Sequence, residues 1–177
     1  LASGHSTNLA ENHGIIIKRP LQHMKECILI VKSALETGSL TFSGEIYNIP
    51  KLTLLRPECH QPVPIYIGGL RPKLAELAGE LADGVIFLGS NPEFIKWQKD
   101  YVEQGAIKAG RDPLEIDYWA RTCIYVAPTK EAARREVASY AATAARNRYW
   151  YLQRKTPGIQ NLGDIIERAP VSYTHLT

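Results

Sequence analysis

The segment from Val63 to Leu88, VPIYIGGLRPKLAELAGELADGVIFL, constrains the fold of this chain more than any other stretch. Short apolar runs with β-branched residues predict buried strands over Val63–Ile67 and Val85–Leu88. Between them, a glycine turn leads into a helix that begins at Pro72, a residue suited to the first helical position. Two strands joined in this way form a right-handed βαβ unit. The glycine turn then lies at the carboxyl end of the first strand, where open α/β sheets and α/β barrels bind their ligands.

Helices and strands alternate along the rest of the chain. Leu40–Pro62 is an irregular excursion with a possible hairpin around Ser43-Gly44. The other segments with a regular pattern are helices after Arg19-Pro20, from Asn91-Pro92 to about Ala109 and after Thr129, and a strand over Ile116–Ala127. Such alternation predicts an α/β protein with a parallel sheet. Two architectures fit: an open doubly wound sheet, and the carboxyl-terminal part of a (β/α)8 barrel, which needs about 250 residues and hence further sequence at both ends.

Composition excludes several classes of protein. The chain has 177 residues, 45% of them hydrophobic and 22% charged, as in an ordinary globular domain. A net charge of +3 is too weak to predict nucleic-acid binding, and no apolar run reaches the roughly 18 residues of a membrane helix. Cys27, Cys59 and Cys123 form no CxxC pair, and the histidines lack metal-ligand spacing. We therefore expect a cytoplasmic protein without a metal site, nucleic-acid partner or membrane anchor.

Both ends of the sequence are unusual. The chain opens on LASGHS rather than Met, a pattern typical of a strand end that runs into a loop. Its last seven residues, VSYTHLT, can be encoded by GTC TCT TAT ACA CAT CTG ACG, which matches the end of a transposon used to prepare DNA for sequencing. We expect residues 1–170 to be a partial domain and residues 171–177 to be a translated adapter. The alternative is a natural polar tail.

Three strand ends lead into helix starts: Gly68–Arg71, Leu88–Asn91 and Ala127–Thr129. In a parallel sheet they open on one rim, where free N–H groups at helix starts suit an anion and Arg71 can contact a phosphate. The alternative is that Gly68-Gly69 only makes a tight turn and that Arg71 is solvated. The turn is neither GxGxxG nor a Walker A loop, which disfavours an NAD fold or an ATPase.

A second candidate is His5 in the loop Gly4-His5-Ser6. Imidazole at a strand end can donate a hydrogen bond to a ligand or transfer a proton. The alternative is an exposed loop histidine with no such role. Aromatic residues such as Trp119 and Trp150 are expected in the core rather than stacked on a cofactor.

These residues resemble a known family. VPIYIGGLRPKLAELAGELADGVI, SNPEFIKW, EQGAIKAGRD and IDYWARTCIYVA, preceded by RPLQHMKECILIVKSAL and TFSGEIYNI, are similar to the carboxyl-terminal half of the luciferase-like oxidoreductases. The likeness covers about residues 1 to 145 and points to the deazaflavin branch typified by methylenetetrahydromethanopterin reductase. It implies a (β/α)8 barrel that binds coenzyme F420, or FMN, at its carboxyl rim and transfers a hydride between the cofactor and an organic substrate.

The resemblance also implies roles for individual residues. Ser3, Gly4, His5 and Asn8 match the loop that touches the cofactor ring, with His5 as the catalytic residue; several relatives have an acidic residue there. The family's turn on the phosphate side of the cofactor is matched by Gly68, Gly69, Leu70 and Arg71. The next strand end, which faces cofactor or substrate in the family, is matched by Leu88, Gly89 and Ser90. Further cofactor residues of the family lie on earlier strands.

Two alternative functions remain open at this point. One is an FMN-dependent monooxygenase of the same barrel, which needs a flavin reductase and oxygen. The other is a flavin-binding relative without turnover. The substrate is a small molecule of unknown identity, and relatives commonly form dimers, so we expect a homodimer of the full-length protein. The 177 residues alone are expected to fold poorly and to be inactive.

Overall fold

The computed structural model describes residues 1–2, 13–56, 63–69, 71–88, 92–121, 124–138 and 140. The chain divides into two compact units. The first comprises Leu1–Ser90 and Gln98–Arg121, and the second comprises Asn91–Trp97 and Thr122–Thr177. The first unit contains the predicted α/β pattern, so it is described first.

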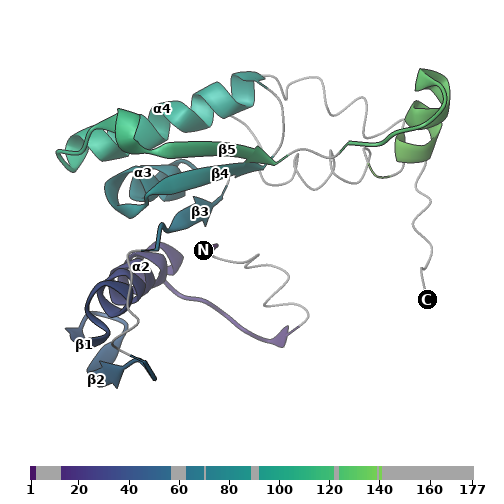
Figure 1. The fold of residues 1–177 in the computed structure, drawn as a ribbon. Coiled ribbons are helices and arrows are strands. Elements are labelled where there is room, and N and C mark those ends of the chain that lie inside the picture. The colour runs from purple at the N-terminus through teal and green to yellow at the C-terminus, as the bar shows by residue number, and fades with distance from the viewer. Residues whose placement is uncertain are drawn as a thin grey trace. The chain divides into compact units, whose positions relative to one another are not determined.

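A three-stranded parallel sheet forms the centre of the first unit (Figure 1). Its strands are β3 (Tyr66–Gly68), β4 (Gly84–Leu88) and β5 (Asp117–Arg121), in the order β3-β4-β5. This confirms the parallel βαβ arrangement over the central segment. The predicted strand over Ile116–Ala127 was too long. The last β4–β5 pair joins Leu88 to Arg121, and residues 124–127 form no strand because no described strand extends alongside them.

The two faces of this sheet differ sharply in burial. Ile67, Val85 and Phe87 point to one face and are each 3% exposed or less. Residues one position away in each strand point to the opposite face, where Ile86 is 36% and Trp119 is 61% exposed. The expectation that Trp119 belongs to the core is therefore wrong for this structure. Its register places it on the uncovered face, beside Ile86.

The first residue of the chain pairs with the free edge of β3. The Leu1 amino group donates to the Tyr66 carbonyl at 2.6 Å, and the Gly68 N–H donates to the Leu1 carbonyl at 2.9 Å. These two bonds have the pattern of a parallel ladder, because both flanking residues of Ile67 bond to Leu1. Leu1 therefore continues the sheet beyond β3, as expected for a strand end.

Helix α3 (Pro72–Leu81) and, from Gln98 onward, helix α4 (Pro92–Lys108) cover the buried face. Pro72 occupies the predicted first position of α3. From Gln98 onward, α4 packs closely on α3 at two glycines. A Cβ at Gly79 would lie 1.9 Å from the Val102 carbonyl oxygen, and one at Gly105 would lie 2.0 Å from that of Glu76. The backbones thus touch where side chains are absent.

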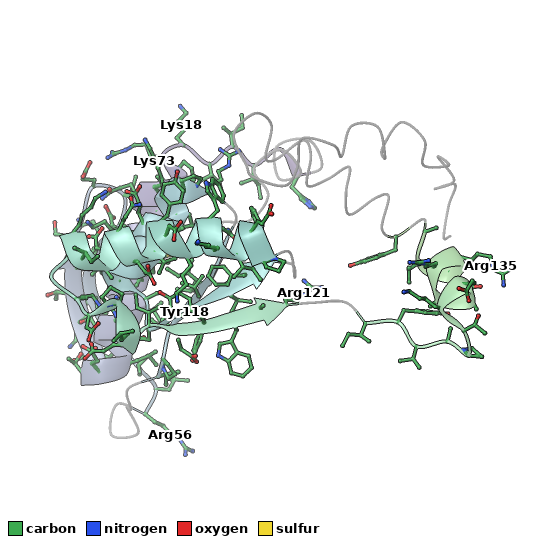
Figure 2. All side chains as sticks on the ribbon, turned by 90° about the horizontal axis from the view of Figure 1, so that it is seen from above. Lys18, Arg56, Lys73, Tyr118, Arg121 and Arg135 are labelled. Carbon is green, nitrogen blue, oxygen red and sulfur yellow. The ribbon has the colours of Figure 1, made fainter. Side chains whose placement is uncertain are left out.

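The turn after α4 leads directly into β5. Gly110 follows α4 with a φ of +72°, as expected for a residue that closes a helix. A short 3-10 helix, η2 (Pro113–Glu115), then precedes β5 and begins at Asp112, whose side chain accepts a bond from the Leu114 N–H at 2.9 Å. Tyr118 points from β5 toward α4 (Figure 2), where the Lys99 ammonium lies 5.0 Å from its ring centre.

Helix α2 (Pro20–Thr37) carries the hairpin of β1 (Ser39–Ser43) and β2 (Asn48–Thr53), which confirms the hairpin predicted around Ser43-Gly44. The buried Glu26 carboxylate anchors the hairpin turn. It accepts the N–H groups of Glu45 at 2.9 Å, Ile46 at 3.0 Å and Tyr47 at 2.8 Å. The ion pairs that link α2 to the region of α3 are Lys25 with Glu80 at 2.7 Å and Lys32 with Asp83 at 2.8 Å.

The second unit includes residues 124–138 and 140 among those described. Residues 130–138 are helical. The Thr129 hydroxyl accepts the Ala132 N–H at 3.1 Å, which confirms the predicted cap. At the start of α4, the rings of Phe94 and Trp97 stack with their centres 5.7 Å apart. None of the described helices combines the length and the apolar character needed to cross a membrane.

Candidate functional site

The site is built around Gly68, the last residue of β3. Register aligns Gly68 with Ile86 and Ile86 with Trp119, so the three lie in one row on the uncovered face. Gly68 does not have a positive φ, and a Cβ there would meet only the Ile86 carbonyl oxygen, at an ordinary 3.9 Å. Among the described residues, neither backbone conformation nor packing requires a glycine. Within the described part of the chain, a Cβ would therefore fit above the end of β3, and glycine leaves that room free.

Gly69 has a different, structural reason to be glycine. A Cβ there would lie 2.2 Å from a methyl carbon of Leu74, a buried residue of α3. The Gly69 carbonyl is held by Gln98, whose Nε2 donates to it at 2.8 Å. Gln98 is only 1% exposed, and sequence reasoning missed it. The available signal was spacing: Gln98 stands four residues from both Phe94 and Val102, which are buried.

Arg71 stands directly before α3 in an extended conformation, with φ −94° and ψ 142°. Its carbonyl accepts the N–H groups of Leu74 and Ala75, each at 3.0 Å, so its backbone starts the helix. Its side chain is exposed and forms no ion pair with any described residue. An exposed guanidinium at a helix start suits a phosphate, both by charge and by hydrogen-bond geometry.

A polar cluster on the uncovered face lies toward the amino ends of the strands. The Tyr66 hydroxyl and the Trp119 indole N–H both donate to Asp117 Oδ2, each at 2.6 Å. Both bonds lower the pKa of the Asp117 carboxyl, and the bond from Tyr66 has the larger effect. The bond between Tyr66 and Asp117 also raises the pKa of the Tyr66 hydroxyl. Gly84 sits between them in register, and a Cβ there would lie 2.3 Å from the Tyr66 ring. The sequence signal was the Asp-x-Trp spacing, which puts both residues on one strand face.

The structure brings together only some of the predicted site residues. Gly68 ends β3, Gly69 follows it and Arg71 directly precedes α3, so the three lie at the predicted junction of strand and helix. The predicted residues outside the described part of the chain are Ser3, Gly4, His5, Asn8, Leu70, Gly89 and Ser90. The third predicted strand end, Ala127–Thr129, is wrong because β5 ends at Arg121 (Figure 2). Within the described ranges, no group of three or more His, Cys, Asp or Glu side chains is arranged to hold a metal ion.

The chain belongs to the luciferase-like monooxygenase family, whose profile matches residues 1–169. It is 34% identical over 133 residues to the 5,10-methylenetetrahydromethanopterin reductase of Methanolobus tindarius, covering 74% of this chain and 39% of that protein. It is 31% identical over 126 residues to the F420-dependent glucose-6-phosphate dehydrogenase of Microbacterium testaceum, covering 70% of this chain and 37% of that protein. The chain thus spans about two fifths of the length of these curated relatives. The resemblance seen in the sequence is confirmed.

Solved structures show the same fold. An F420-dependent secondary alcohol dehydrogenase in complex with an F420-acetone adduct superposes with a TM-score of 0.69 at 22% identity, over 98% of this chain and 51% of that one. The coenzyme F420 dependent tetrahydromethanopterin reductase from Methanopyrus kandleri gives 0.64 at 20% identity, over 94% and 56%. The chain therefore has an α/β fold resembling that of these enzymes.

Proposed function

We propose that this chain is the carboxyl-terminal part of a (β/α)8 barrel oxidoreductase that transfers a hydride between coenzyme F420 and a small organic substrate. Residues 1–170 are then a partial barrel, and residues 171–177 are an adapter tail. F420 is favoured over FMN because relatives matched over the same residues are named as F420-dependent enzymes. The observation that carries the location of the site is the room that Gly68 leaves, among the described residues, at the end of β3 beside the turn that holds Arg71.

The unequal faces of the sheet support a barrel rather than a doubly wound sheet. A doubly wound sheet carries helices on both faces, whereas a barrel carries them only outside and fills its interior with side chains from all its strands. Here α3 and the part of α4 from Gln98 onward cover the face of Val85 and Phe87, and Trp119 is exposed on the other. The pairing of Leu1 with β3 adds a further parallel position to the sheet. The uncovered face then corresponds to the barrel interior.

The residues at the turn fit a phosphate-bearing cofactor. Gly68 leaves room for close approach, and Arg71 offers a charge-assisted contact to a phosphate. Leu1 bonds to Gly68 at the carboxyl end of β3. Ser3, Gly4, His5 and Asn8 follow Leu1 in sequence. By resemblance, this loop and Gly89-Ser90 contact the cofactor ring or substrate, and His5 moves a proton. When bound, the cofactor itself supplies the hydride chemistry.

The experiment uses the full-length protein, obtained by reading the source DNA past both ends of this reading frame. Oxidised F420 is supplied with alcohols and sugar phosphates, which can donate a hydride, and reduced F420 is supplied with oxidised pterins, which can accept one. Reduced FMN is tested with the same panels, and the redox state of the cofactor and oxygen consumption are recorded. The proposal predicts substrate-dependent, oxygen-independent turnover with F420. Substrate-dependent oxygen consumption with reduced FMN, above its spontaneous oxidation, and no turnover with F420 would indicate the monooxygenase alternative. Cofactor binding without turnover on any substrate would favour the non-catalytic alternative.

Further properties of the full-length protein follow from the same proposal. We infer a cytoplasmic homodimer that acts on a small molecule. Size-exclusion chromatography with light scattering tests the dimer. A monomer at working concentration that turns over F420 would refute the dimer while leaving the catalytic proposal intact.

A further inference from the structure

Gln98 places a buried amide against the glycine turn that precedes α3. The side chain is 1% exposed, and its Nε2 donates to the Gly69 carbonyl oxygen at 2.8 Å. Its neighbours on the same stripe of α4, Phe94 and Val102, are apolar and are 2% and 0% exposed. A polar residue therefore occupies a position where the helix otherwise buries hydrophobic side chains.

The second half of this amide is unexplained by the described structure. Gln98 Oε1 is buried and has no hydrogen-bond partner among the described residues. Most buried polar atoms in proteins do have a partner, because leaving one unpaired is costly. An apolar residue of similar length would fill this position without that cost. Among the described residues, the hydrogen bond to the Gly69 carbonyl is thus the one interaction that requires an amide at position 98.

That bond fixes the direction of the Gly69 carbonyl. Because Gln98 holds this carbonyl toward α4, its partial negative charge is kept away from an anion at the turn. The arrangement favours an anion beside Gly68 and Arg71.

We propose that Gln98 is a positioning residue that holds the Gly69 carbonyl away from the phosphate of the cofactor. This inference rests on the proposed function, and it concerns affinity rather than the hydride step. Gln98 itself contacts the turn and not the cofactor. Removing its donor should therefore weaken binding of phosphate-bearing F420 but leave binding of the deazaflavin ring unchanged.

The test compares Gln98→Met with Gln104→Met in the full-length protein. Met has nearly the length of Gln and no comparable donor, and Gln104 is an exposed residue of the same helix. Dissociation constants are measured for F420 and for its phosphate-free deazaflavin riboside, together with kcat at saturating F420. We expect Gln98→Met to raise the F420 dissociation constant about tenfold, as for one lost hydrogen bond, with the riboside constant and kcat unchanged.

The two dissociation constants separate the positioning role of Gln98 from the proposed function. An equal loss for F420 and the riboside, or no loss for either, overturns the positioning role while the proposed function stands. A wild-type protein that binds neither compound overturns both. If Gln98→Met does not accumulate as folded protein, Gln98→Leu serves in its place, since an uncharged aliphatic side chain cannot donate to the Gly69 carbonyl. The same selective loss is then expected, and an unselective one refutes the inference.

Discussion

The contact between α3 and α4 at Gly105 gives the sharpest prediction about stability. A Cβ at this position would lie 2.0 Å from the Glu76 carbonyl oxygen and 2.7 Å from its carbonyl carbon. Both neighbours are backbone atoms, so no side-chain rotation can relieve the contact. Because ordinary contacts begin at 3.4 Å, the two helices would have to separate by about 1.4 Å. Gly105→Ala should therefore destabilise the protein.

Two opposing effects set the size of this change. Alanine is favoured over glycine inside a helix by about 1 kcal/mol. Overpacking a well-packed interface costs about 1–3 kcal/mol, and more where backbone must move. Separation would also loosen Val102 and Ala106, both fully buried where α4 meets α3. We expect a net loss of roughly 1–2 kcal/mol in the free energy of unfolding.

Urea denaturation of the full-length protein measures this loss through the midpoint at constant m. Gln104→Ala, at the preceding exposed position, is the matched control and should change stability by less than about 0.5 kcal/mol. Adding Gly79→Ala to Gly105→Ala should cost less than the sum of the two single changes, because the helices are already apart. A Gly105→Ala protein that is more stable than wild type, as helix propensity alone predicts, would refute the close packing.

Three further predictions concern the hairpin anchor and the site. Burial acts to raise the pKa of Glu26, but hydrogen bonds from Gln22 and from three backbone N–H groups outweigh it and lower the pKa to about 2. The ionised Glu26 carboxylate should thus contribute its full stability above pH 4.5 and lose it as the pH falls toward 2. The difference in urea midpoint between wild type and Glu26→Gln should therefore narrow only below about pH 4. A difference that disappears at higher pH contradicts the anchoring role of Glu26. His5→Ala should lower kcat by about 10²- to 10⁴-fold with little change in F420 affinity, and an unchanged kcat would remove His5 from the chemistry. Arg71→Gln should weaken F420 binding and flatten its salt dependence, whereas Lys51→Gln on the hairpin should do neither; titrations at two salt concentrations distinguish them.

The parts of the fold that could be predicted from sequence are those set by local rules. Pro72 and Thr129 mark helix starts, and Gly38 ends α2 with a φ of +73°. These signals depend on backbone geometry within a few residues, so they can be read without knowing tertiary contacts. The βαβ alternation likewise follows from the periodicity of apolar residues.

The errors arose where long-range pairing decides the outcome. The segment after Arg121 has the alternation of a strand, but no described strand continues alongside it. The sequence favours a core position for Trp119 because large aromatics are usually buried. Its position on the uncovered face depends on its register with Ile86, which the sequence does not reveal.

The site was predictable only as a turn. Gly68-Gly69 before Pro72 is visible in sequence, but the two glycines have different roles that depend on Leu74 and on the open face. Gln98 lies 29 positions after the carbonyl that it holds, and only the folded chain brings the two together.

The most direct test of the central claim is a parallel titration of the full-length protein with F420 and FMN. Binding is followed by isothermal calorimetry, with Arg71→Gln titrated beside wild type. We expect F420 to bind more tightly than FMN and Arg71→Gln to weaken F420 binding. Tight binding of FMN without measurable affinity for F420 would contradict it.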